Sequence, residues 1–326
     1  MTYQHFPKVE LHTHLEGSAP PDFIRSLARE KNIDLSRIFN DDGGYIFRDF
    51  AHFLKVYEAA CEPLQTPQDF YRLTKAVLEE FASHSVVYAE TFVSPDFCGG
   101  GDVVKWRDYL AAMEQAADEM SGTITLKAIA TIIRHAGPEQ AKRTARCAVE
   151  TQNGFLTGFG LAGAEMMHRP GDFAYSFDMA REAGMHLTAH AGEWGGPDMV
   201  QETLDLLKVE RVGHGVNAVT DPDLVARLAE EGITLEVCPG SNIVLRAIDR
   251  WEDHPIQTLR EAGVPVTVST DDPPFFHTTM TAEYDSLARV FGYGDDDFHA
   301  LNETAIAAAF CDDATKKAVR ARLEKA

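Results

Sequence analysis

Eight short apolar runs recur along the chain, and the segments between them have the composition of helices. Most runs lack a strict alternation of apolar and polar residues, which is typical of parallel strands that are covered on both faces. The pattern therefore predicts eight buried strands that alternate with helices. The predicted strands are Val9–His14, Val86–Val93, Ile124–Ile133, Phe155–Leu161, His186–His190, Arg211–His214, Thr234–Cys238 and Val264–Ser269.

Glycines mark the ends of three predicted helices. Gly184, Gly232 and Gly263 each follow a polar, helix-like segment and precede an apolar run. Glycine adopts the left-handed backbone conformation without a Cβ clash, so it closes a helix just after its last turn. Capping residues before a proline, at Thr66–Pro67 and Asp221–Pro222, indicate helix starts.

Eight units of strand and helix fit a (β/α)8 TIM barrel, an α/β fold. A doubly wound open sheet alternates strands and helices in the same way, and periodicity alone does not exclude it. Residues 16–85, between the first two strands, form a longer segment than one crossover helix needs, so we expect extra helices after the first strand. No linker rich in proline or serine divides the chain, and we expect residues 1–326 to form a single domain.

The composition limits the partners that the chain can have. Hydrophobic residues make up 44% of the sequence, which is enough for a sizeable core. With 30 Lys and Arg against 51 Asp and Glu, the net charge of -21 argues against nucleic acid and anionic membranes as partners. Five scattered cysteines without a CxxC pair argue against a disulfide framework. The absence of a long apolar run or a leader-like N-terminus favours a cytoplasmic protein. No pattern indicates an oligomeric state.

Side chains of metal-ligand types stand at the ends of four predicted strands. His12 and His14 end the first strand, His190 the fifth and His214 the sixth, and Asp271 follows the eighth. In a barrel the C-terminal ends of all strands open onto one face, and residues two apart on a strand point the same way. Imidazole and carboxylate ligands suit zinc, with a coordination position left for water.

Each of these residues also has an ordinary structural explanation. A histidine near a strand end is commonly a hydrogen-bonded structural residue, and Asp271 and Asp272 before Pro273 could cap a helix. If all of these residues had only structural roles, their occurrence at the ends of four strands on one face would require four coincidences. Glu193, just beyond His190 on a loop with glycine, adds a carboxyl group that could transfer protons, with a solvated loop glutamate as the alternative.

Several motifs together resemble the adenosine/adenine deaminase family of the amidohydrolase superfamily, most of all a bacterial adenosine deaminase. They occur in the order that the family shows and span nearly the whole chain. The motifs are Pro7–Ser18, Val87–Glu90 with Ser94–Pro95, Leu161–Gly163, His190–Glu193, Arg211–Gly215, Cys238–Asn242 and Ser269–Pro273.

The resemblance implies one Zn²⁺ ion held by His12, His14, His190 and Asp271, with a water molecule completing the coordination. His214 would orient or deprotonate that water, whose pKa zinc lowers from 15.7 to about 7. Relatives with two metals carry a bridging lysine or glutamate at the end of the fourth strand. This chain has Gly-Leu-Ala-Gly there, so a single zinc ion is favoured.

The same resemblance implies hydrolytic deamination of a purine. Glu193 would protonate N1 of the ring, Asp272 would hydrogen-bond N7, and the backbone N–H of Gly163 would face N3, with His14 and Glu16 also close to the substrate. Removal of an amino group from an aromatic amidine requires an activated water, a proton donor for the ring and a base. Residues of all three types are present.

An aromatic segment follows the first strand. Phe47, Phe50, Phe53, Leu54 and Tyr57 are spaced to share one helical face, which is typical of a stripe that packs on the core. In the family, the segment that matches residues 50–54 forms an apolar lid over the substrate. The resemblance therefore implies that Phe53 and Leu54 contact the substrate.

The motifs point to more than one substrate. Glu16 and Ala164 stand where adenosine-specific members usually carry Asp, and a Glu at the first position occurs among relatives that act on adenine or modified nucleosides. Leu161–Gly163 and Asp271–Phe276 look more like bacterial nucleoside deaminases. We therefore expect an adenosine deaminase that converts adenosine and 2′-deoxyadenosine to the inosine products and ammonia. The alternatives are a deaminase of adenine, of a modified adenine nucleoside or of a related metabolite, and a non-catalytic zinc-binding or purine-binding barrel. The last of these would not need the two predicted acid–base residues.

Overall fold

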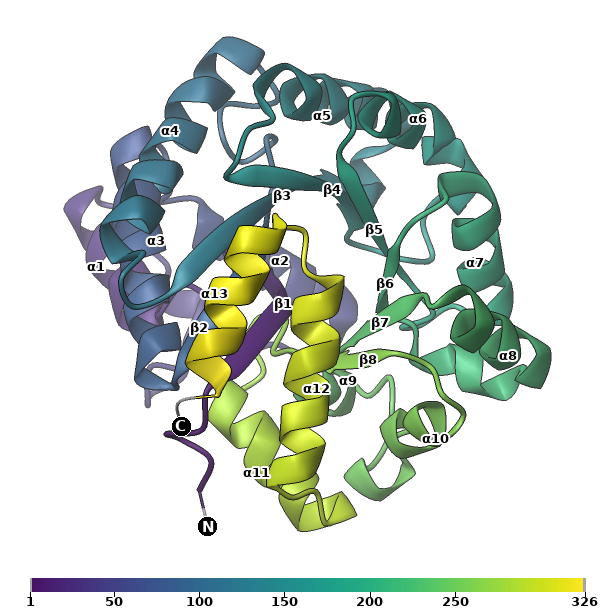
Figure 1. Cartoon of the computed structure of the whole chain (residues 1–326). Helices are drawn as coiled ribbons and strands as arrows, with labels where there is room; N and C mark the ends of the chain where they lie inside the picture. The colour runs from purple at the N-terminus through teal and green to yellow at the C-terminus, as the bar shows by residue number, and fades with distance from the viewer. Residues whose placement is uncertain (1, 325–326) are drawn as a thin grey trace.

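A ring of eight parallel strands forms the centre of the computed structural model, which describes residues 2–324 (Figure 1). Each strand pairs with the next one along the chain. The ring closes through hydrogen bonds from the N–H of Asp271 to the carbonyl of His12, 3.0 Å, and from the N–H of His14 to the carbonyl of Asp271, 3.1 Å. This order confirms the (β/α)8 TIM barrel and excludes a doubly wound sheet, whose strand order reverses at a switch point. The strands are β1 (Lys8–His14), β2 (Val86–Val93), β3 (Thr125–Ile133), β4 (Leu156–Ala162), β5 (His186–Ala191), β6 (Arg211–His214), β7 (Thr234–Val237) and β8 (Val266–Val268).

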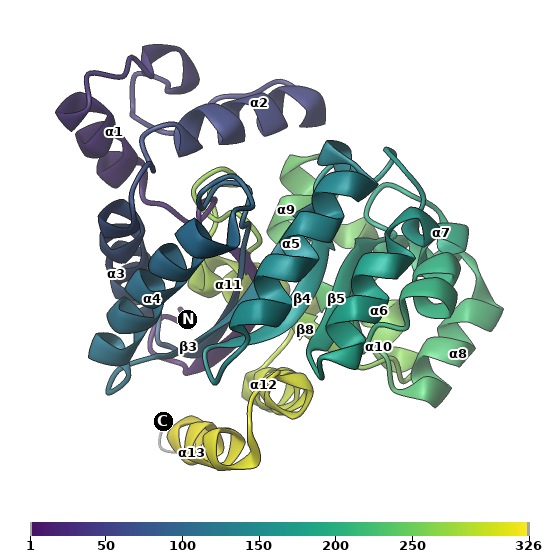
Figure 2. The ribbon, with the colours of Figure 1, turned by 90° about the horizontal axis from the view of Figure 1, so that it is seen from above.

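Helices surround the ring and also lie at both of its ends. In Figure 2, α1 and α2 lie at one end, whereas α12 and α13 lie at the opposite end. The extra helices expected within residues 16–85 are thus present between β1 and β2. The helices are α1 (Pro21–Glu30), α2 (Phe50–Cys61), α3 (Pro67–Ser83), α4 (Val103–Met120), α5 (Pro138–Thr151), α6 (Ala174–Glu182), α7 (Pro197–Glu202), α8 (Pro222–Glu231), α9 (Pro239–Val244), α10 (Ile256–Glu261), α11 (Met280–Phe291), α12 (Asp295–Ala308) and α13 (Asp313–Leu323).

The observed element boundaries follow the local signals in the sequence. Every strand begins and ends within two residues of its predicted limits. Gly184, Gly232 and Gly263 have φ angles of +83°, +67° and +84°, which confirms that they close the preceding helices. Thr66 forms a capping box at the start of α3, and the side chain of Asp221 accepts two backbone hydrogen bonds at the start of α8.

Side chains fill the end of the barrel beneath α12. Phe310, which follows α12, is buried against Phe92 and Ile129. The guanidinium group of Arg211 lies 3.5 Å from the centre of the Phe310 ring and pairs with two buried carboxylates. Because this end is filled, the end that carries the C-termini of the strands remains for a site, as is usual in this fold.

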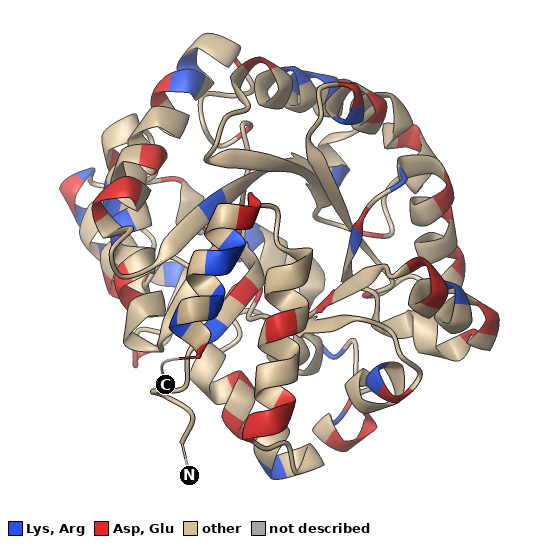
Figure 3. Cartoon of the chain, viewed as in Figure 1, with Lys and Arg blue, Asp and Glu red and all other residues tan. Residues whose placement is uncertain are grey.

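Charged side chains lie mostly on the outer helices. Acidic residues are spread around the ring of helices, while α13 carries a group of basic residues (Figure 3). Among residues 2–324 there is no helix with the length and apolar character that crossing a bilayer requires. The five cysteines are free thiols, in agreement with the absence of a predicted disulfide framework.

Candidate active site

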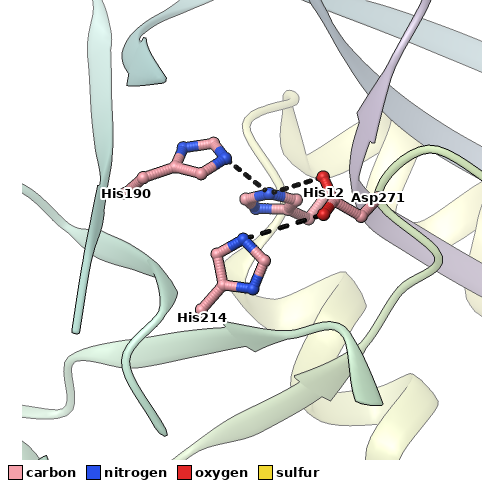
Figure 4. A group of neighbouring side chains, drawn as sticks. All are labelled: His12, His190, His214 and Asp271. Atoms are coloured by element: carbon pink, nitrogen blue, oxygen red, sulfur yellow. Dashed lines mark hydrogen bonds and ion pairs between the residues drawn. The ribbon is translucent and has the colours of Figure 1, made fainter. Parts of the chain in front are cut away.

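Three histidines and an aspartate converge at the C-terminal end of the barrel (Figure 4). His12 lies on β1, His190 on β5 and His214 at the end of β6, and Asp271 follows β8. One ligand atom from each of these buried residues lies within 4.8 Å of the others. The Nε2 atom of His12 is 3.0 Å from Nε2 of His190 and 3.7 Å from Oδ1 of Asp271. His12 and Asp271, the first and last of these residues in the sequence, are 259 positions apart. They belong to one group because the barrel brings the ends of its strands together.

His14 belongs to a second group that shares Asp271 with the first and also contains Asp272. The Nε2 atom of His14 lies 3.2 Å from Oδ1 of Asp271. His214 and Asp271 both have left-handed backbone conformations, with φ angles of +59° and +66°. Residues other than glycine rarely adopt this conformation, and such strain is typical of functional sites.

The hydrogen bonds behind His12 and His190 show that these two rings are suited to bind a metal ion. Nδ1 of His12 lies 2.7 Å from the carboxylate of Glu236, and Nδ1 of His190 lies 2.9 Å from the carbonyl oxygen of Leu161. Both partners accept hydrogen bonds, so each ring carries a hydrogen on Nδ1. Burial lowers the pKa of His190 well below its ordinary value, so that ring is neutral. The Nε2 atom of His190 therefore carries a lone pair, and it lies 3.0 Å from Nε2 of His12, close enough for one cation to be bound by both rings.

Glu236 on β7 supports the first of these histidines. It is fully buried and also accepts hydrogen bonds from Thr188 and Arg211. Burial alone would raise the pKa of Glu236, but the guanidinium of Arg211 and the ring of His12 hold it below its ordinary value. The carboxylate is therefore charged where it meets His12. Sequence reasoning missed Glu236, although a charged residue inside a short buried strand was a usable signal.

An open cavity of about 730 Å³ lies above the His–Asp group. The predicted residues Glu16, Gly163, Glu193 and Asp272 line it together with His14, so the structure brings all of them to one place. Helix α2 covers one side of the cavity. The residues that α2 contributes are Phe50, Phe53, Leu54, Tyr57 and Glu58.

The aromatic stripe is only partly helical. Phe47 precedes α2 and does not line the cavity, which corrects the expectation that it shares a helical face with the others. The centre of its ring lies 5.4 Å from the centre of the Phe53 ring and 6.3 Å from the centre of the Phe276 ring. Phe53 is buried and Leu54 half-buried. The stripe therefore packs on the core and also forms part of the cavity wall.

Three carboxyl groups in the cavity are buried and have raised pKa values. Burial and the nearby Asp271 raise the pKa values of Glu193 and Asp272 well above the ordinary range. Burial raises the pKa of Glu16 to about 7. Within the described residues, Oε1 of Glu16 and Oδ1 of Asp272 have no hydrogen-bond partner. Buried polar atoms of this kind are typical of a place where a polar ligand binds.

The loop that carries Glu193 is held by a glutamate that sequence reasoning missed. The carboxylate of Glu165 accepts hydrogen bonds from the backbone N–H groups of residues 192–195, at 2.6 to 3.1 Å. The side-chain amide of Asn217 donates to the carbonyl oxygens of Glu193 and Gly195, both at 3.0 Å. Glu165 is 1% exposed. No local pattern distinguishes Glu165 from a solvated loop residue, because its four partners lie about 30 residues away.

Comparisons with known proteins agree with this arrangement. A family model described as Adenosine deaminase matches residues 7–326. An adenine deaminase of Rhizobium rhizogenes is 45% identical over 324 residues, which cover 98% of this chain and 99% of that protein. The crystal structure of adenine deaminase from Arthrobacter aurescens is 30% identical and has a TM-score of 0.87, with 98% of each chain covered. An amidohydrolase from Burkholderia ambifaria with bound Zn is 29% identical and has a TM-score of 0.88, with 99% of this chain and 90% of that chain covered.

These comparisons show that the expectation of adenosine as the substrate was wrong. Relatives that are 42–46% identical to this chain are adenine deaminases. The expectation rested on Leu161–Gly163 and Asp271–Phe276, and residues of both segments line the cavity beside the His–Asp group. Adenine and adenosine share the ring that would react there, so these segments carry little information about a sugar. Because the family model matches nearly its whole length, the chain belongs to the adenosine deaminase family and is a hydrolase that removes an amino group by breaking a C–N bond.

Proposed function

We propose that this protein is an adenine deaminase, which uses one zinc ion to hydrolyse adenine to hypoxanthine and ammonia. The observation that carries the proposal is the buried carboxyl group of Glu193, which lines the same cavity as His190, His214 and Asp271. The relatives named adenine deaminase support the choice of substrate.

His12, His14, His190 and Asp271 would hold the zinc ion. The Nε2 atoms of His12 and His190 support this choice, because they lie 3.0 Å apart while each ring donates a hydrogen bond from Nδ1. The related amidohydrolase with bound Zn supports the identity of the metal. In such a site zinc supplies an activated water, because it lowers the pKa of water from 15.7 to about 7.

The buried acids would supply protons and hydrogen bonds to the purine ring. Because burial raises its pKa, the carboxyl group of Glu193 is suited to hold a proton and give it to N1. Protonation of N1 makes C6 more electrophilic toward water. Asp272, also protonated, would donate to N7, and the N–H of Gly163 would lie near N3. As water adds to C6, one of its protons would return to the carboxylate of Glu193, and the other would pass from the new hydroxyl group to the amino nitrogen. The C6–N bond would then break, ammonia would leave, and the oxygen would remain on C6 as a carbonyl.

Glu16 favours the free base over a nucleoside. It is 3% exposed, and its carboxyl group interacts with the hydroxyl of Tyr57. The family resemblance implies that this position would lie near the sugar of a nucleoside, and adenine has an N–H on its five-membered ring where adenosine has ribose. A carboxyl group there would accept a hydrogen bond from adenine, whereas a nucleoside offers no donor at that atom. Phe53 and Leu54 of α2 would cover the ring.

A substrate panel tests the proposal. The zinc-loaded protein is incubated with adenine, adenosine, 2′-deoxyadenosine and an N6-methylated adenine nucleotide, and ammonia release is measured. We expect kcat/KM to be highest for adenine. A higher kcat/KM for any other compound, or no ammonia from adenine, would overturn the proposal.

A further inference from the structure

A chain of hydrogen bonds lies behind His214 and ends at a backbone amide. The Nδ1 atom of His214 is 3.2 Å from Nδ2 of Asn242 on α9. The Oδ1 atom of Asn242 is 3.2 Å from Nε2 of His254, and the backbone N–H of Ile256 donates to Nδ1 of His254 at 3.2 Å. The three side chains are at most 3% exposed.

The backbone amide fixes the direction of every bond in this chain. The N–H of Ile256 can only donate, so Nδ1 of His254 carries a lone pair. Burial lowers the pKa of His254 to about 4, so its ring is neutral and its one hydrogen is on Nε2. That hydrogen is donated to Oδ1 of Asn242, and the amide nitrogen of Asn242 then donates to Nδ1 of His214. The remaining hydrogen of a neutral His214 ring must therefore be on Nε2.

His214 thus differs from the two other histidines in its group. His12 and His190 donate from Nδ1, whereas His214 accepts at Nδ1 and presents an Nε2–H. Its Nε2 atom has no hydrogen-bond partner in the described part of the chain. This atom lies 3.9 Å from carboxylate oxygens of both Glu193 and Asp271, so it faces the reacting centre.

We propose that Asn242 and His254 are positioning residues that hold His214 in the Nε2–H tautomer. His214 then offers a hydrogen-bond donor to the oxygen that attacks the purine, and it offers no lone pair to a metal ion. The tautomer follows from the hydrogen bonds alone, whereas its role in catalysis rests on the proposed function. This assignment also explains why His14, and not His214, completes the proposed set of zinc ligands.

Nitrogen NMR on protein with ¹⁵N-labelled histidine tests the tautomer directly. The His214 signals are identified by their loss in His214→Asn, and the spectra are recorded with and without zinc. We expect Nε2 of His214 to carry the hydrogen and Nδ1 to be bare in both states. A hydrogen on Nδ1 would overturn the proposal. This measurement needs no turnover, so it tests the tautomer of His214 independently of the proposed function. Failure of the proposed function would appear instead as wild-type protein that is inactive toward adenine.

Two substitutions test the effect on turnover. In Asn242→Asp, a carboxylate accepts from both neighbouring rings and moves the hydrogen of His214 to Nδ1. We expect kcat for adenine to fall by about 100-fold or more, since a wrong tautomer is costly in other enzymes, while KM changes little. His254→Leu removes the donor and should also lower kcat, and His254→Gln restores an N–H at that place and should recover most of the loss. Equal losses in the Leu and Gln variants, with an unchanged NMR tautomer, would show that the residues only fill space and would overturn the proposal.

Discussion

The Nε2 atoms of His12 and His190 face each other at 3.0 Å, and each ring donates a hydrogen bond from Nδ1 on its opposite side. The carboxylate of Glu236 fixes the first ring, and a backbone carbonyl fixes the second. A carboxylate also makes an imidazole a stronger metal ligand. The affinity for metal should therefore depend on Glu236.

The substitution Glu236→Gln should weaken zinc binding by about 10–100-fold, because it removes the negative charge behind His12. Competition with a chelator of known affinity measures this change. The control is Glu210→Gln, which makes the same change of charge at a half-exposed carboxylate that pairs with His186. Unchanged zinc affinity in Glu236→Gln would show that the carboxylate does not support a metal ligand.

A side chain at position 213 should disturb the metal site. A Cβ atom on Gly213 would lie 2.8 Å from Cε1 of His12 and 3.2 Å from both Nδ1 and the Cα atom of His190. We expect Gly213→Ala to lose bound zinc and most of its activity, since both rings must move. Gly122→Ala, where a Cβ would have no neighbour within 4 Å, is the control. Full zinc content in purified Gly213→Ala would contradict the geometry described here.

Loss of charge at Glu165 should loosen the loop that carries Glu193. In Glu165→Gln, an amide N–H replaces one of the oxygens that accept four backbone hydrogen bonds. We expect a loss of about 2–3 kcal/mol in stability, with a lower kcat and unchanged zinc content. Hydrogen exchange should become faster at residues 192–195. The exposed Glu139→Gln serves as the control, and equal exchange in the two variants would contradict the role of Glu165.

Burial of Glu283 should make stability depend on pH. Burial raises its pKa from 4.5 to about 7, although it accepts hydrogen bonds from Thr278 and the N–H of Gly240. At a pH between these two pKa values, the unfolded chain loses the proton of Glu283 while the folded chain keeps it. The free energy of unfolding therefore falls as pH rises, by about 3 kcal/mol in total. Glu283→Gln should remove this part of the dependence. Denaturant unfolding of the metal-free protein at pH 5 and pH 8 measures it, and parallel pH profiles for variant and wild type would refute the assignment.

The sequence was sufficient to predict the barrel because its signals are local. Glycines at 184, 232 and 263 terminate helices through a backbone conformation that other residues avoid, and buried apolar runs mark the strands. The positions of His12, His190 and Asp271 then follow from the fold, since all strand ends meet at one face. Phe47 was misplaced because apolar spacing does not show where a helix begins.

The residues that support the site were harder to find. Glu165, Asn242 and His254 act through partners that are distant in sequence or that depend on loop conformation. From the sequence, adenine was expected only as an alternative substrate. Motifs that would bind the purine ring shared by adenine and adenosine outnumbered Glu16 and Ala164, the two residues that differ from the adenosine-specific pattern.

Ammonia release from adenine by Glu193→Gln, compared with wild type at equal zinc content, tests the central claim most directly. The substitution keeps the size of the side chain and its distance from the His–Asp group but removes the proton that the ring would receive. We predict that zinc content is unchanged and that kcat falls by about 10²–10⁴-fold. A zinc-loaded Glu193→Gln variant that deaminates adenine at the wild-type rate would contradict the account.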